Sequence, residues 1–185
     1  MAVRFDADGE DYTRTLTLGA QAAISACCWV KISTDRNTFS TAISLDNGTG
    51  DALFIQTATD GTTMGVYEEP LGGFAGTGRA FTVGTWYWVA FSINGTTGTQ
   101  YSRALTDTTV TTAALSGLQA THNIATLRIG ESAWGTEWLN GAVTAVKVWQ
   151  AALTQAELEA EALAHRPRRT ANLIAWYPLT RAETT

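Results

Sequence analysis

The chain has 185 residues, a formal net charge of −5 and 16% charged residues. This length predicts a single domain, residues 1–185, with enough chain to bury a hydrophobic core without disulfides. The acidic balance argues against a nucleic-acid partner, which would require a basic surface. No apolar run approaches the roughly 20 residues of a membrane-spanning helix, and no secretory signal peptide is recognisable in the chain as given.

Most of the chain, taken in order, has the pattern of short strands separated by turns. The clearest alternation lies in residues 24–32, so the adjacent Cys27 and Cys28 are expected on opposite faces, where they do not suggest a disulfide. Turn dipeptides such as Asp60-Gly61 separate the segments. Strands are expected over residues 2–5, 14–18, 24–32, 39–45, 52–57, 64–67, 80–83, 86–93, 99–104, 108–112, 126–130, 143–149 and 172–179.

One short helix is expected near the C-terminus. Thr154 and Glu157 have the spacing of a capping box, in which each side chain accepts a hydrogen bond from the backbone N–H of the other residue. Leu153 and Leu158 flank this box as a hydrophobic staple would. The sequence therefore predicts an all-β, two-sheet antiparallel sandwich with one short C-terminal helix.

Three stretches together resemble a laminin-G-like domain of the concanavalin A-like lectin/glucanase fold. Residues 3–12 are similar to the opening strand and turn of such domains, and residues 84–91 read Gly-Thr-Trp-Tyr-Trp-Val-Ala-Phe, like their Gly-x-Trp-x-x-Val-Ala strand. Residues 140–158 combine Asn-Gly, an apolar strand ending in Trp and Leu-Thr-Gln-Ala-Glu-Leu, like the end of the domain. The resemblance implies a jelly-roll sandwich and does not define a function, because this fold carries lectins, hydrolases and structural modules.

A tryptophan-bearing loop is the main candidate for ligand binding. Trp134, Glu137 and Trp138 lie in the polar segment 131–138, where exposed indoles suit the stacking of sugar rings and a carboxylate suits their hydroxyls. The alternative is that the two indoles fold back over the edge of the sandwich. Trp88 is a further candidate, because the face opposite Val89 and Phe91 could line a concave sheet surface. Core positions are expected for the remaining indoles, Trp29, Trp86, Trp149 and Trp176.

An acidic turn near the N-terminus is a candidate calcium site. Asp6, Asp8 and Asp11 supply the hard oxygen ligands that Ca²⁺ prefers. The resemblance implies a calcium ligand in this turn and a second acidic residue near position 144, but Val143 and Thr144 stand there, so that second ligand is missing. The alternative is an acidic turn that is only solvated.

Nothing in the sequence indicates an enzyme. Hydrolases of this fold place paired carboxylates on one strand, as in Glu-x-Asp-x-x-Glu, and this chain has no such spacing. Two functions therefore stay open. The first is a non-catalytic module that binds glycans or another cell-surface partner. The second is a structural bacteriophage protein, a minor tail or capsid-decorating subunit that contacts other virion subunits or forms a homo-oligomer. Both place the chain outside cells or on a virion surface.

Overall fold

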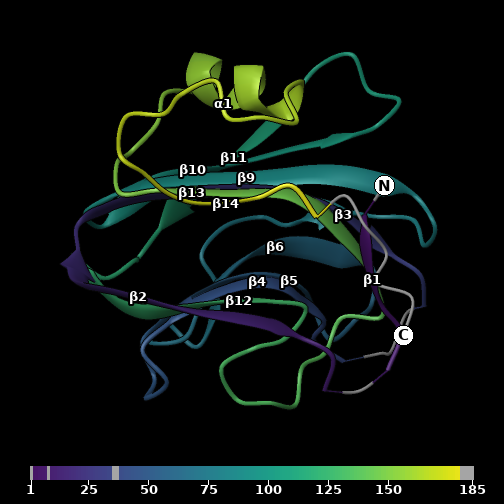
Figure 1. Cartoon of the computed structure of the whole chain (residues 1–185), viewed down its shortest axis with the longest axis horizontal. Coiled ribbons are helices and arrows are strands. Elements are labelled where there is room, and N and C mark those ends of the chain that lie inside the picture. Colours follow the sequence, from purple (N-terminus) through teal and green to yellow (C-terminus); the bar gives the residue numbers. More distant parts are fainter. Residues whose placement is uncertain (1, 8, 35–37, 180–185) are drawn as a thin grey trace.

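The computed structural model describes residues 2–7, 9–34 and 38–179. In this part of the chain two antiparallel β-sheets pack face to face, and the helix α1 (Gln155–Ala162) lies on the outer face of one of them (Figure 1). The predicted fold, an all-β jelly-roll sandwich with one short C-terminal helix, is confirmed. Among these residues, no helix is long and apolar enough to cross a membrane.

We call the sheet beneath α1 sheet A and the other sheet B. Sheet A has the order β1 (Val3–Phe5), β13 (Gly141–Trp149), β3 (Ala23–Ile32), β9 (Trp86–Asn94), β10 (Thr97–Ala104) and β11 (Thr111–Ser116), and β14 (Leu173–Tyr177) also pairs with β13. Sheet B has the order β2 (Tyr12–Gln21), β12 (His122–Ile129), β4 (Thr41–Asp46), β5 (Ala52–Thr57), β6 (Thr63–Glu68) and β7 (Gly73–Phe74), and β8 (Arg79–Ala80) also pairs with β6.

Two cores lie on opposite faces of sheet A. The main core fills the space between the sheets and includes Cys28, Val89 and Phe91. A smaller core lies between sheet A and α1 and includes Cys27. Alternation along β3 thus places the two thiols on opposite faces, as predicted. Burial raises the pKa of Cys27 to about 12 and that of Cys28 well above its ordinary value.

The smaller core shows that the prediction for Trp88 is wrong. Trp88 is only 1% exposed and packs under α1 with Trp149, Leu153 and Leu158. The face opposite Val89 is therefore not an open concave surface, because the helix covers it. The reverse error concerns Trp176, for which a core position is predicted but which is 37% exposed on β14.

A β-bulge in β13 determines which of its side chains face the main core. Val143 and Val146 both face the main core although they are three residues apart, which strict alternation does not allow. The register between β13 and β3 shifts between Thr144 and Lys147, and Ala145 takes a positive φ of 52°. The extra residue therefore turns Val146 inward and directs Lys147 toward α1.

A buried ion pair fastens α1 to sheet A. Lys147 Nζ lies 2.7 Å from Glu161 Oε2, and both side chains are fully buried. The ammonium also donates to the carbonyls of Glu161 and Ala164, at 3.2 and 2.5 Å. Glu161 Oε1 accepts hydrogen bonds from the backbone N–H groups of Arg168 and Arg169, each at 2.7 Å. Both charges are thus well hydrogen-bonded, as burial requires.

The helix begins with the predicted capping box of Thr154 and Glu157.

Val146→Asp is expected to unfold the domain, because it would place an unpaired carboxylate in the main core. Circular dichroism and a thermal melt would measure this. Val83→Asp is the matched control, since Val83 is exposed and the change there should alter stability by no more than about 0.5 kcal/mol. A soluble Val146→Asp protein with a cooperative melt would contradict the assigned phase of β13.

Glu161→Gln is expected to reduce the free energy of unfolding by about 3–5 kcal/mol, because Lys147 would stay buried without its counter-charge. Denaturant titration would measure the change. The same exchange at Glu159, which is half-buried on α1, should have little effect. Equal midpoints for the two variants would show that the ion pair does not hold the helix in place.

Candidate functional site

The loop of residues 131–138 follows β12 and lies beside sheet B, on the side away from α1 (Figure 1). Its base is closed by a hydrogen bond from the N–H of Leu139 to the carbonyl of Gly130, at 2.8 Å. Within the loop, Trp138 Nε1 donates to Glu131 Oε1 at 2.8 Å. Gly130 has a positive φ of 92°, and a Cβ there would collide with the Phe5 ring. The loop is therefore a closed structure that only glycine permits at its start.

The loop is also tied to the neighbouring strand. The N–H of Thr41, at the start of β4, donates to the carbonyl of Glu137 at 3.2 Å. The buried Ser132 hydroxyl accepts from the N–H of Trp134 at 3.3 Å. These bonds place the Trp134 indole and the Glu137 carboxyl beside sheet B.

Five aromatic side chains gather there, and we call them the aromatic platform: Phe39, Phe54, Tyr67, Phe74 and Trp134. Phe54 is buried, with its ring centroid 5.3 Å from that of Trp134 and 6.0 Å from that of Tyr67. Tyr67 continues the contacts to Phe39 at 5.4 Å and to Phe74 at 5.6 Å. These separations are typical of packed aromatic pairs, so the rings support one another.

The platform lies on the outer face of sheet B. Leu53 and Ile55 face the main core, so Phe54 between them faces outward, and Tyr67 faces outward next to Val66 for the same reason. Trp134 comes from the loop and is 42% exposed. The platform therefore presents one accessible indole over buried and half-buried rings.

Two carboxylates adjoin the platform. Burial raises the pKa of Glu137, the nearby charge of Glu69 raises it further, and a hydrogen bond with Ser132 opposes both effects. Burial also raises the pKa of Tyr67, with added effects of Glu69 and Glu137, so its hydroxyl stays neutral and can donate. An exposed indole with carboxylate acceptors and a phenol donor can stack on a flat apolar ring and bind polar groups at its edge.

The structure brings together part of the predicted ligand-binding set. Trp134 and Glu137 lie at the platform, and Trp138 is half-buried with its indole N–H used by Glu131. Ligand binding by these residues stays a prediction. Sequence reasoning missed Phe39, Phe54, Tyr67 and Phe74, which reach the platform from other segments. The usable signal was one aromatic residue at an outward position of each strand, Phe54 in residues 52–57 and Tyr67 in residues 64–67.

The two described members of the predicted calcium set, Asp6 and Asp11, each contact a neighbouring side chain. Asp6 pairs with Arg4 at 3.2 Å, and Asp11 accepts a hydrogen bond from the Thr13 hydroxyl. The Glu10 carboxylate accepts from the N–H of Asp6 at 2.7 Å. Asp8 lies outside the described residues. Within those that are described, no three His, Cys, Asp or Glu side chains form a group able to hold a metal. Calcium binding at this turn stays a prediction.

A second aromatic surface lies on the outer side of sheet A. Trp29, Trp86 and Leu105 line a pocket of about 320 Å³, and Leu105 is 60% exposed. Lys31 Nζ lies 5.6 Å from the centre of the Trp86 ring. Trp29 and Trp86 are half-buried, so the expected core position holds only in part.

The family is shown by comparison with known proteins. Residues 7–159 match the laminin-G model of the concanavalin A-like lectin/glucanases superfamily. The chain belongs to this superfamily, as the resemblance of its sequence motifs implied. No curated protein matches it significantly.

Several solved structures share the fold. A putative carbohydrate binding protein from Bacteroides ovatus is 14% identical with a TM-score of 0.69, over 100% of this chain and 52% of that one. The enzymatically active domain of tailspike protein 2 from bacteriophage CBA120 is 13% identical with a TM-score of 0.67, over 96% of this chain and 29% of that one. Domain 4 of the extracellular arabinanase AbnA from Geobacillus stearothermophilus, in complex with arabinotriose, is 15% identical with a TM-score of 0.62, over 87% of this chain and 76% of that one. The chain thus spans about half or less of the first two structures.

Glu137→Gln is expected to stabilise the protein at neutral pH and to leave it nearly unchanged in acid. The pKa of Glu137 is raised in the folded state from its ordinary value of 4.5, so the folded protein keeps the carboxyl proton at pH values where the unfolded chain has lost it. The free energy of unfolding therefore falls as the pH rises from about 4.5 through the folded pKa. The neutral amide of the variant lacks this penalty. Melting temperatures at about pH 4 and about pH 7 would measure it, and a gap between variant and parent that is equal at both pH values would contradict the expectation.

Proposed function

We propose that this chain is a non-catalytic glycan-binding module that acts outside the cell or on a virion surface. The observation that carries the proposal is the partly exposed Trp134 indole, held over the aromatic platform beside Glu137 and Glu69. The similarity to a putative carbohydrate binding protein and to a domain in complex with arabinotriose supports it through the fold.

The platform suits a neutral sugar. The apolar face of a pyranose or furanose ring stacks on the Trp134 indole, and its hydroxyls donate to Glu137 or Glu69 and accept from Tyr67. A uronic or sialic acid would bring its carboxylate next to Glu137 and Glu69, whose charges already act on one another. We therefore expect neutral glycans to bind in preference to acidic ones.

The positions of the carboxylates in the chain support binding without hydrolysis. Glu137 lies in a loop and Glu69 follows the end of β6, whereas a hydrolase of this fold carries its carboxylate pair on one strand. The raised pKa of Glu137 would nevertheless suit a general acid, so hydrolysis has to be measured. Release of reducing ends that disappears in Glu137→Gln would overturn the non-catalytic assignment.

Trp134→Ala is expected to abolish glycan binding and to leave the fold intact, since it removes one edge-on contact with Phe54 worth about 0.5–1.5 kcal/mol. A glycan array with the purified chain, with added calcium and with chelator, would measure binding. Trp176→Ala is the matched control, because Trp176 has similar exposure and lies on β14, away from the platform. Equal binding by both variants would remove the platform from the proposal.

The chelator arm of the array separates two kinds of module. Binding that is abolished by chelator would make calcium part of the site and would favour Asp6, Asp8 and Asp11 as its ligands. Binding that chelator leaves unchanged would assign recognition to the platform alone.

The second candidate function is a structural virion subunit. It is favoured by the similarity to the tailspike domain, which extends over 96% of this chain. This function requires a stable homo-oligomer or binding to other virion subunits. Light scattering coupled to size-exclusion chromatography would test it, because an obligate oligomer that binds no glycan supports the virion subunit and a monomer that binds glycans supports the module.

A further inference from the structure

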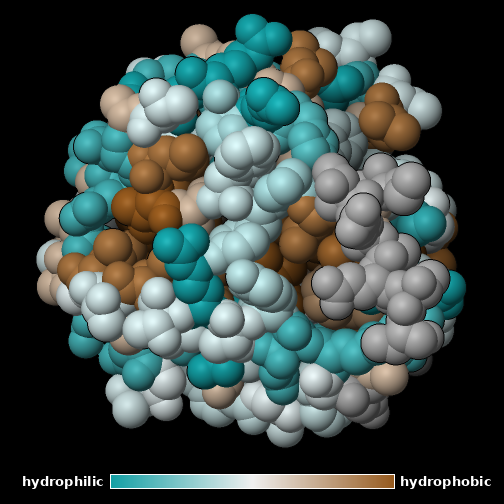
Figure 2. All heavy atoms as spheres, in the orientation of Figure 1, coloured by the Kyte–Doolittle hydropathy of each residue, from teal (hydrophilic) through white to brown (hydrophobic). Residues whose placement is uncertain are grey.

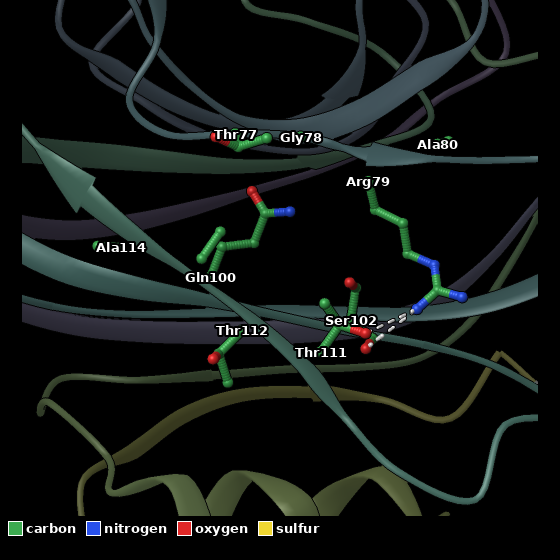
Figure 3. Close-up of a pocket in the computed structure, with 10 residues that line it drawn as sticks. Thr77, Gly78, Arg79, Ala80, Gln100, Ser102, Thr111, Thr112 and Ala114 are labelled. Atoms are coloured by element: carbon green, nitrogen blue, oxygen red, sulfur yellow. Dashed lines mark hydrogen bonds between the residues drawn. The ribbon is translucent and has the colours of Figure 1, made fainter.

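A pocket of about 640 Å³ opens between the two sheets at an edge of the sandwich, where β8 and the segment before it face β10 and β11 (Figure 3). Its volume lies within the range of about 300–1,000 Å³ that small-molecule sites occupy. No residue lines both this pocket and the aromatic platform. The pocket is therefore a separate candidate site.

Two glycines shape the segment that closes one side of the pocket. A Cβ on Gly76 would lie 2.4 Å from the Ala114 carbonyl of β11, and a Cβ on Gly78 would lie 2.2 Å from Thr63 Cγ2 of β6. The segment thus touches sheet A at one glycine and sheet B at the other. The N–H of Ser116 donates to the Ala75 carbonyl at 2.9 Å, which joins the two edges just before they diverge.

Gln100 places a hydrogen-bond donor in this space. It is 2% exposed and reaches from β10 across to sheet B, where its Oε1 accepts from the N–H of Val66 at 3.0 Å. Because that bond requires the oxygen, the amide orientation is fixed and Nε2 is the free end. Nε2 has no hydrogen-bond partner within the described ranges, and it points into the space between Gly78 and Arg79 (Figure 3).

The other polar groups of the pocket are arranged around Arg79. Its Nη2 pairs with Asp107 at 2.7 Å, while Nη1 makes only long contacts, at 3.5 Å to the Ser102 carbonyl and 3.4 Å to Thr111 Oγ1. The pKa of Asp107 is lowered by the backbone N–H of Ala104 and by Arg79, so the carboxylate stays charged and balances the guanidinium. The pocket is thus close to neutral and rich in donors and hydroxyls.

We propose that this pocket is a second ligand site that binds a neutral saccharide unit, with ligand hydroxyl oxygens accepting from Gln100 Nε2 and Arg79 Nη1 and ligand hydroxyls donating to Thr111 Oγ1. An anionic ligand gains little here, because Asp107 already pairs with Arg79. An apolar ligand would leave the Gln100 amide without an acceptor, which costs about 1–3 kcal/mol. The site rests on the pocket alone and does not require the platform to bind glycans.

Adjacent threonines of β11 provide a matched test. The Thr111 side chain faces Arg79, whereas Thr112, which also lines the pocket, directs its side chain away from Arg79 toward the other face of β11 (Figure 3). Thr→Val keeps the shape and strand propensity of either side chain and removes only the hydroxyl. In a Trp134→Ala background, binding of neutral mono- and disaccharides, for example glucose, N-acetylglucosamine, arabinose and maltose, would be measured by ligand-observed NMR and titration calorimetry.

Thr111→Val is expected to weaken this binding about 3- to 10-fold, and Thr112→Val to leave it unchanged. Gln100→Glu keeps an acceptor for Val66 and removes the donor, so it should abolish binding. Ala113→Leu, which adds bulk at the lining, should also abolish it and covers the case in which Gln100→Glu does not fold. Binding that none of these variants changes, binding of glucuronic acid in place of neutral sugars, or no binding at about 10 mM in the Trp134→Ala background would overturn the proposal. Loss of glycan binding at the aromatic platform alone would not contradict the proposal for the pocket.

Discussion

The buried pair of Lys147 and Glu161 decides which surfaces of this sandwich are open. Both charges are removed from water, so each needs the other, and the backbone donors and acceptors around them complete the arrangement. The pair holds α1 on the outer face of sheet A, where Trp88 and Trp149 become part of a second core. The outer face of sheet B carries no helix in the described ranges, and the Trp134 indole beside it is 42% exposed.

The two candidate sites arise from different properties of a sandwich. The platform lies on the outer face of sheet B, where strand alternation directs Phe54 and Tyr67 outward. The loop that begins after Gly130 adds Trp134. The pocket uses an edge, where the sheets separate and the side chains of Gln100 on β10 and Arg79 on β8 each reach across to the other sheet. Figure 2 shows a third kind of surface, the side on which β14 and β2 run, where apolar patches alternate with hydrophilic side chains and no single apolar area dominates.

Local patterns in the sequence were sufficient for the fold and for part of the site. The capping box of Thr154 and Glu157, the alternation of β3 and the polar loop with Trp134 all depend on neighbours within a few residues, and the structure contains each of them. Long-range packing was not readable. Trp88 is buried by a helix that lies more than sixty residues later in the chain. The side chains of β13 that face the core depend on a bulge at Ala145, and no glycine or other typical turn residue marks this bulge in the sequence. Gln100 looked like an ordinary strand residue, because its partner Val66 lies on the other sheet.

The burial of both cysteines has a practical and a biological consequence. Because Cys27 and Cys28 lie in separate cores and their thiols stay protonated, neither can be attacked readily by oxidants or form a bridge with another chain. The chain can thus remain in oxidising surroundings without cross-linking, although it has no disulfide of its own among the described residues. For the same reason, a cysteine introduced at an exposed position would be the single reactive thiol, so a fluorophore could be attached beside either candidate site without removing the native pair.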